Sequence, residues 1–360
     1  MSRTIHFPDK VKADFVDKFN IDSETDGLFS HDLDMEFSGV KTVHVKTVKS
    51  EPLQDYDRSK EVGTGSRYGR TIEVGDHEAT YEMTQDKSLS LSIDKGNQKE
   101  NLNMPRAAHV MKAERQERIV PEVDKYRLKK WAAEAGIHIE LAAAPTKATI
   151  LQMIMDAKSR MVDAGCPENG LQLRVARKYE STLKLSEEWV KLNDLGGKTL
   201  PKGTMGELDG MATKFVTSGK LPANVPFMII HKGSCISPMK IKDFKAHVDP
   251  PGLSGDLIEF RLIYDAFVLA HKADGVCCGC LPGSVVKTPA ISMASNKATV
   301  TCATDSASIF YTTDGSDPRF SGDAKAYSST VTLTAGDELR VCAKKDGMFW
   351  SDVAAVDYNG

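Results

Sequence analysis

The chain has 360 residues, a formal net charge of −3 and 41% hydrophobic residues. This length and apolar content suffice for a sizeable core and predict two or three domains. The near-neutral charge excludes a nucleic-acid-binding protein that is basic throughout. No run of about 18 apolar residues is present, which excludes a helical membrane protein.

The N-terminal sequence and the cysteine pattern both indicate the cellular compartment. The first eight residues contain no apolar signal core, so we do not expect export by a cleaved signal. The seven cysteines are odd in number and irregularly spaced, which argues against a disulfide framework. A reducing cytoplasm fits this pattern best.

The first 49 residues mix charges with short apolar clusters and predict an extended arm with one short helix around residues 8–19. Alternating stretches at 42–48 and 80–95 predict strands with one buried face. The segment between them, residues 50–75, is charged, rich in glycine and too polar to form a core. Loops of this length are usually functional or disordered. Two interpretations stay open, namely an arm that lies on a neighbouring subunit and a disordered surface loop.

A long helix is predicted from Pro105, which suits a first helical turn, to Gly136, which suits a C-terminal stop. Pro121 removes one backbone hydrogen bond and should kink or interrupt it. Basic residues outnumber acidic ones along this helix by eight to four between residues 106 and 130. A solvated face explains the excess, and so does a contact with a polyanion such as DNA. The candidates for that contact are Arg106, Lys112, Arg115 and Arg118.

The next part of the chain interleaves helix and strand patterns. Thr146 is a candidate cap for a helix that ends at Gly165. A short helix is expected at 177–185, and strands are expected at 171–175, 225–230, 236–248 and 257–269. This order predicts a mixed α+β body.

The composition changes after Cys280. Residues 281–287 have the composition of a linker, and helical patterns vanish from residue 288 onward. Short strands at 297–303, 308–313, 330–333, 338–344 and 353–358 predict a small β-sandwich. Cys302 and Cys342 lie in apolar runs of two of these strands, where an intersheet disulfide and two reduced thiols both fit.

No catalytic constellation is present, so we predict neither catalytic residues, nor a metal, nor a cofactor. The glycines at 63–69 do not have the GxGxxG spacing, and the CxxC at 277–280 lacks the second ligand pair of a zinc site. An aromatic and acidic set in the last domain suggests a sugar-binding patch, although turn chemistry and core packing explain the same residues. This set consists of Tyr311, Asp314, Asp317 and Trp350.

Six segments, in this order and spacing, resemble the major capsid proteins of tailed bacteriophages, whose fold is named after phage Hong Kong 97. They are MTQDKSLSLSIDK at 83–95, VPEVDKYR at 120–127, GELDG at 206–210, FMIIHK at 227–232, DPPG at 249–252 and YDAFVLAHKADGV at 264–276. The resemblance implies an N-terminal arm at 1–49, an extended E-loop at 50–75 and a peripheral domain with its spine helix at 96–145. It implies an axial domain at 146–235 and a return to the peripheral domain at 236–280.

The capsid resemblance also implies a function. The chain would be a structural protein, not an enzyme, that self-assembles through hexamers and pentamers into an icosahedral shell around double-stranded DNA. The expected location is the virion capsid, assembled in the host bacterial cytoplasm with a portal. Only about fifty residues precede the E-loop, so a separate scaffolding protein is expected. The expected contacts of the loop with a neighbouring subunit are Arg67, Tyr68 and Arg70.

The segment SIFYTTDGSDP at 308–318, followed by KDG at 345–347 and Ser351, resembles the immunoglobulin-like C-terminal domain of chitobiases and β-hexosaminidases. This resemblance covers about 289–358 and implies an all-β immunoglobulin-like domain at 288–360. We expect it to project outward as a decoration, with surface glycans as a candidate partner. Two alternatives stay open for the whole chain: an encapsulin-like shell around an enzyme cargo, and a carbohydrate-binding surface protein.

Overall fold

A computed structural model describes residues 23–29, 36–38, 42–48, 55–59, 67–68, 76–94, 107–186 and 207–358. The helix expected around residues 8–19 lies outside the described residues. The chain forms two compact units. The first combines Met1–His31, Ile93–Ser237 and Ala266–Gly360, and the second combines Asp32–Ser92 and Pro238–Asp265. Within the described residues, no helix is long and apolar enough to cross a membrane.

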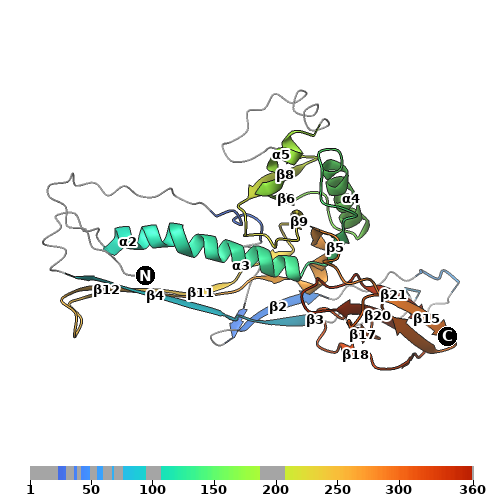
Figure 1. The fold of residues 1–360 in the computed structure, drawn as a ribbon. Helices are drawn as coiled ribbons and strands as arrows, with labels where there is room; N and C mark the ends of the chain where they lie inside the picture. Colours follow the sequence, from blue (N-terminus) through green and yellow to red (C-terminus); the bar gives the residue numbers. More distant parts are fainter. Residues whose placement is uncertain are drawn as a thin grey trace. The chain divides into compact units, whose positions relative to one another are not determined.

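A six-stranded mixed sheet lies at the centre of the first unit (Figure 1). Its strands are, in spatial order, β5 (Ile137–Glu140), β14 (Val276–Cys280), β9 (Phe227–His231), β6 (Leu171–Ala176), β8 (Met211–Val216) and β7 (Glu207–Leu208). Along β9, Phe227 and Ile229 enter one core cluster while Met228 and Ile230 enter another. Both faces of the sheet are therefore buried, as the unbroken apolar run of this strand suggests.

A helix contributes to the core on each face of this sheet. On one face, α4 (Ile150–Asp163) supplies Ile154 and Met161. On the other face, α3 (Val120–Ala133) supplies Leu128 and Trp131. A short 3-10 turn, η2 (Arg177–Tyr179), and helix α5 (Glu180–Lys184) follow β6, close to the predicted helix at 177–185.

The helix after β5 starts later than expected. Thr149 holds the N-cap position of α4 and makes no side-chain capping bond, whereas Thr146 was expected to cap. Thr146 lies one turn earlier, where its carbonyl oxygen accepts hydrogen bonds from the N–H groups of Thr149 and Ile150 at 3.2 and 3.0 Å.

The predicted long helix is interrupted near its proline. It consists of α2 (Ala107–Glu114), a π-helical turn η1 (Arg115–Ile119) and α3, with Pro121 in the first turn of α3. Because proline lacks an N–H, one α-helical hydrogen bond is missing at Pro121, and the turn directly before α3 is π-helical. Gly136 follows the helix end, and a Cβ on it would lie 2.4 Å from the carbonyl carbon of Ala273. Only glycine therefore permits this close approach.

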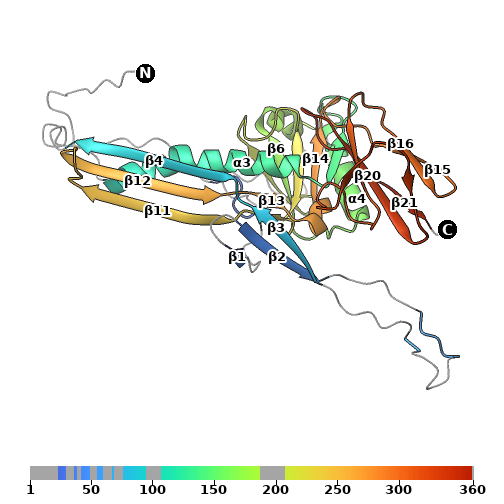
Figure 2. The same ribbon diagram turned by 90° about the horizontal axis from the view of Figure 1, so that it is seen from below.

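The second unit contains two three-stranded antiparallel sheets. One has the order β1 (Glu36–Ser38), β2 (Thr42–Val48), β3 (Asp76–Glu82). The other has the order β11 (Met239–Val248), β12 (Gly255–Tyr264), β4 (Gln85–Asp94), and Figure 2 shows these long strands side by side.

The strand predicted at 80–95 is in fact two strands. It breaks at Met83 and Thr84, where Asp265 accepts hydrogen bonds from the Thr84 N–H at 2.7 Å and from its hydroxyl at 2.9 Å. The strand predicted at 257–269 also stops early, at Tyr264. The next residues form β13 (Phe267–Val268), which pairs with β10 (Cys235–Ile236) in the first unit.

The last part of the chain, residues 288–358, is all β and is called the C-terminal domain below. One sheet has the order β15 (Ala290–Ala294), β16 (Lys297–Thr301), β19 (Val331–Thr332). The other has the order β18 (Lys325–Ala326), β17 (Ser308–Thr312), β20 (Asp337–Lys344), β21 (Ala354–Tyr358). The two sheets share one core, and Cys302 and Cys342 are free thiols. The predicted strands recur here, and β15 and β18 are additional ones.

Candidate functional site

The described residues hold no group of three or more His, Cys, Asp and Glu side chains that could bind a metal ion. The CxxC motif shows why. Cys277 packs in the core on one face of the sheet, while Cys278 and Cys280 pack in the core on the other face. Burial raises the pKa of the Cys280 thiol to about 12. These thiols are therefore packing residues, because they lie in the cores on opposite faces of the sheet and do not converge on one site.

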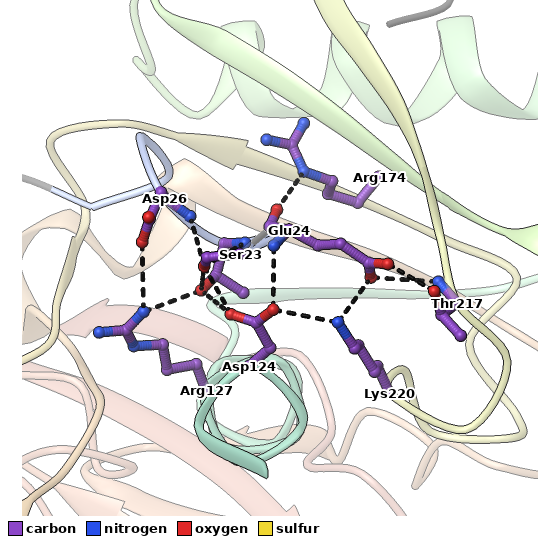
Figure 3. Close-up of polar contacts among 9 residues, drawn as sticks. Ser23, Glu24, Asp26, Asp124, Arg127, Arg174, Thr217 and Lys220 are labelled. Atoms are coloured by element: carbon purple, nitrogen blue, oxygen red, sulfur yellow. Dashed lines mark hydrogen bonds and ion pairs between the residues drawn. The ribbon is translucent and has the colours of Figure 1, made fainter. Parts of the chain in front are cut away.

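In the described part of the first unit, a buried polar cluster joins residues 23–29 to helix α3 (Figure 3). We call residues 23–29, together with their partners on α3 and around the sheet, the N-terminal anchor. The partners are Asp124, Arg127, Trp131, Gln172, Arg174, Thr217 and Lys220. Its centre is Asp124, whose exposed fraction is 1%. Oδ1 of Asp124 accepts hydrogen bonds from the hydroxyls of Ser23 at 2.7 Å and Thr25 at 2.6 Å. Oδ2 accepts from the Glu24 N–H at 2.9 Å and from Lys220 Nζ at 3.0 Å.

Electrostatics keep this buried carboxylate ionised. Burial alone would raise the pKa of Asp124, but the hydrogen bonds from Thr25, Glu24 and Ser23 and the charge of Lys220 lower it below its usual value. All four acceptor directions of the carboxylate are used, which is what an ionised buried carboxyl requires.

Further bonds tie the same segment to the sheet. Glu24 pairs with Lys220 at 3.3 Å and accepts a hydrogen bond from the Thr217 N–H at 3.1 Å. Arg174 in β6 donates to the Glu24 carbonyl oxygen at 3.4 Å, and burial lowers the pKa of its guanidinium to about 10. Gln172 donates to the Gly27 carbonyl oxygen at 2.8 Å.

Apolar contacts complete the anchor. Leu28 and Phe29 are buried in the core, and the ring of Phe29 lies 6.1 Å from that of Trp131. The guanidinium of Arg127 lies 4.6 Å from the centre of the Phe29 ring and donates to the Thr25 hydroxyl at 2.9 Å. Residues 23–29 are therefore held against α3 and the sheet by both polar and apolar contacts.

The loop at 50–75 contains two described pieces that contact each other. The Asp57 N–H donates to the Arg67 carbonyl oxygen at 3.0 Å, and the rings of Tyr56 and Tyr68 lie edge to face at 4.9 Å. Tyr68 is 79% exposed and Tyr56 is 48% exposed. The other predicted contact residue, Arg70, lies outside the described residues.

The predicted polyanion contacts lie on the long helix. Lys112, Arg115 and Arg118 are exposed there, and Arg106 lies outside the described residues. Each of the four residues of the suggested sugar patch has a partner of its own within the domain. Tyr311 packs with the core between the two sheets, Asp314 caps a turn at Ser316, Asp317 pairs with Arg319, and Trp350 packs edge to face on Phe310.

The C-terminal domain is joined to the rest of the first unit by more than a linker. Within the predicted linker at 281–287, Val285 is buried in the core beside the six-stranded sheet, where Phe320 and Phe349 of the C-terminal domain also pack. The Val286 N–H donates to the Phe349 carbonyl oxygen at 3.1 Å, and the Phe349 N–H donates to the Ser284 carbonyl oxygen at 2.8 Å.

Aromatic and charged contacts strengthen this attachment. The Phe349 ring stacks on the ring of His138 in β5, with centroids 4.9 Å apart and planes 15° apart. His138 is 2% exposed, and burial lowers its pKa to about 4. Arg319, with a side chain only 5% exposed, donates to the Gly136 carbonyl oxygen at 2.5 Å. Arg160 pairs with Asp352, and Lys287 pairs with Glu140.

A cavity of about 340 Å³ lies along this attachment. It is lined by charged residues of both signs, namely Arg160, Asp274, Asp317, Arg319, Arg340 and Asp352. Burial raises the pKa of Asp274, partly offset by the charge of Arg319. Since arginines and aspartates are equal in number here, the cavity carries no net charge and fits an interface held by ion pairs.

Comparison with known proteins gives two independent similarities. Residues 290–355 match the family model of the chitobiase/beta-hexosaminidase C-terminal domain. No curated protein matches the chain.

The rest of the chain is similar to solved phage structures. A chain of Mycobacterium phage Che8 has 17% identity and a TM-score of 0.58, covering 76% of this chain and 96% of that one. The capsid of cyanophage P-SCSP1u has 12% identity and a TM-score of 0.59, with coverage of 77% and 94%. The mature capsid of bacteriophage PhiM1 has 13% identity and a TM-score of 0.54, with coverage of 78% and 93%. The chain therefore has a mixed α/β fold of the kind found in phage capsids, followed by a domain similar to the chitobiase/beta-hexosaminidase C-terminal domain.

Proposed function

We propose that this chain is the major capsid protein of a tailed bacteriophage and self-assembles into an icosahedral shell that encloses double-stranded DNA. The observation that carries this proposal is the fold similarity to phage capsid chains over 93–96% of their own length. The role is structural. In this proposal the body has the Hong Kong 97-type fold, with α2 to α3 as the spine helix. Strands β6, β7, β8 and β9 of the six-stranded sheet belong to the axial domain at 146–235.

The loop at 50–75 acts in this proposal as the E-loop that lies on a neighbouring subunit. The exposed, paired rings of Tyr56 and Tyr68 support this role, because aromatic side chains are enriched in the centres of protein interfaces. Arg67 and Arg70 are the proposed charged contacts beside them. Hexamers, pentamers, a portal and a separate scaffolding protein are the partners that this function requires.

The C-terminal domain is, in this proposal, an immunoglobulin-like decoration displayed on the outer surface of the shell. The contacts of Phe349 with His138 and of Arg319 with Gly136 support a fixed orientation of this domain on the body of the subunit, just after the long helix. Removing residues 288–360 would uncover Val285 and His138, so this truncation also tests the stability of the body. Labelling of the C-terminus on intact shells tests outward display directly.

Electron microscopy of the purified full chain, produced alone and with the genes that flank it, tests the proposed function. Closed shells of uniform diameter are expected. Deletion of residues 54–74 should leave a folded subunit that forms no shells, because the intersubunit contact is lost. Shells of normal size from this deletion variant would contradict the role of the loop, and a strictly monomeric full chain would contradict the function.

A further inference from the structure

One side of the long helix carries a line of positive charge. Between residues 111 and 129, the exposed side chains are Lys112, Arg115, Arg118, Glu122, Lys125 and Lys129. We call these six residues the basic stripe. They recur every three or four residues, so they share one side of the helix. Five of the six are basic, which gives the stripe a formal charge of +4 over about 26 Å.

The orientation of the stripe is set by packing. The opposite side of α3 is buried in the core through Val123, Asp124, Arg127, Leu128, Trp131 and Ala132. Asp124 and Arg127 also hold the N-terminal anchor on that side. The helix therefore cannot rotate to bury the stripe without breaking both the core and the anchor.

The charges of the stripe are not neutralised from within the described part of the chain. There, none of its five basic side chains is paired with a carboxylate, whereas Lys130, on the flank of the stripe, pairs with Glu134 at 2.9 Å. Glu122 is the single acid among them. Such a row of unpaired cations attracts a polyanion.

We propose that the basic stripe binds the phosphate backbone of duplex DNA. This inference rests on the proposed function, which places DNA inside the shell. It extends the polyanion contact predicted at Arg106, Lys112, Arg115 and Arg118 to Lys125 and Lys129. A protein partner fits less well, because every exposed residue of the stripe is charged and protein interfaces need apolar or aromatic anchors. Phosphate contacts need only lysine and arginine and are independent of base sequence.

Equilibrium binding of a 30-base-pair duplex of random sequence to the full chain tests this assignment. Five phosphate contacts predict a slope of about −4.5 for log affinity against log salt, or about 500-fold weaker binding at 200 mM than at 50 mM salt. Replacing all five basic residues of the stripe by glutamine should weaken binding at 50 mM salt by at least about 100-fold and flatten the slope.

A matched control removes the same charge elsewhere. It replaces five exposed lysines outside the helix by glutamine, namely Lys147, Lys232, Lys272, Lys297 and Lys325. The control should change affinity by less than about threefold, since these lysines do not form a row. An equal loss in the control, or unchanged binding in the stripe variant, would overturn the proposal. Polyglutamate of equal total charge that competes as well as the duplex would also overturn it.

Shell formation separates this inference from the proposed function. All substituted residues are exposed, so both variants should fold and form shells when the unmodified chain does. If the stripe variant forms shells but no longer binds DNA, the DNA-binding role of the stripe is supported. If the stripe variant forms shells and binds DNA normally, that role is refuted while the proposed function stands. If the unmodified chain forms no shells, the proposed function is refuted.

Discussion

Replacing Asp124 by asparagine is a sharp test of the N-terminal anchor, because the two side chains have the same shape. Oδ1 of Asp124 accepts two hydrogen bonds and Oδ2 accepts two more, one of them from Lys220. Asparagine keeps one acceptor oxygen and presents an NH₂ group in the other position. If the NH₂ group faces the Glu24 N–H and Lys220, donors point at donors; if it faces Ser23 and Thr25, both hydroxyls must reorient to accept. In both orientations Lys220 loses the charge of Asp124 and keeps only Glu24, at 3.3 Å, as a charge partner.

The expected loss follows from these contacts. Breaking a buried ion pair by removing one partner costs about 3–5 kcal/mol, and we expect Asp124→Asn to lower the free energy of unfolding by about 3 kcal/mol. Urea denaturation of the full chain measures this loss, and hydrogen exchange at residues 23–29 should accelerate with it. Asp156→Asn is the matched control, since Asp156 is on the exposed side of α4 and accepts one bond from Gln152. It should cost less than about 0.5 kcal/mol.

A double-mutant cycle with Lys220→Met tests whether the lost contact between Asp124 and Lys220 causes this destabilisation. The combined variant should be less destabilised than the sum of the two single variants, because removal of the ammonium relieves the donor conflict. A loss below about 1 kcal/mol for Asp124→Asn, or strict additivity with Lys220→Met, would refute the account of the anchor.

Three further predictions concern other parts of the molecule. Phe349→Ala should lower the free energy of unfolding by about 2 kcal/mol, because the contact with His138 is lost. It should also speed proteolysis at residues 281–287, and an unchanged rate of proteolysis would contradict the fixed attachment of the C-terminal domain. The pKa of His138 is about 4 in the folded state and 6.5 unfolded, so its contribution is complete above pH 6.5 and is lost as pH falls toward 4. The difference in unfolding free energy between the parent and His138→Gln should therefore change by about 3 kcal/mol across this window, and a pH-independent difference would argue against a neutral buried ring. Gly136→Ala should destabilise the chain by more than about 1 kcal/mol, with Gly322→Ala as a neutral control, because a Cβ meets Ala273 at residue 136 and open space at residue 322.

The sequence predicted the elements whose signal is local. The alternation in 308–313 and 338–344 and the apolar run in 227–230 correspond to β17, β20 and β9. Pro121 correctly indicated an interruption of the long helix, although a π turn in place of a simple kink could not be read from one proline. The break at Thr84 depends on Asp265, which lies 181 residues away in the chain, so local periodicity did not reveal it.

The N-terminal anchor was not predicted, for a similar reason. Asp124 sits among charged residues of a helix whose sequence reads as a solvated face, and its partners Ser23 and Lys220 are about 100 residues away on either side. The spacing of Asp124 and Arg127 among the apolar positions of α3 was the one available signal, because it places both on the buried side. The attachment of the C-terminal domain was missed because Leu281, Pro282 and Gly283 have linker composition, whereas Val285 and Val286 are core residues.

The central claim is that this chain builds a closed shell from many copies of itself. Cryo-electron microscopy of the assembled full chain tests it most directly, because a reconstruction shows both the symmetry and the subunit fold. The account predicts an icosahedral shell whose density fits the six-stranded sheet and the long helix, with residues 55–68 contacting a neighbouring subunit. Particles without icosahedral symmetry, or a loop at 55–68 that contacts no neighbour in closed shells, would contradict it.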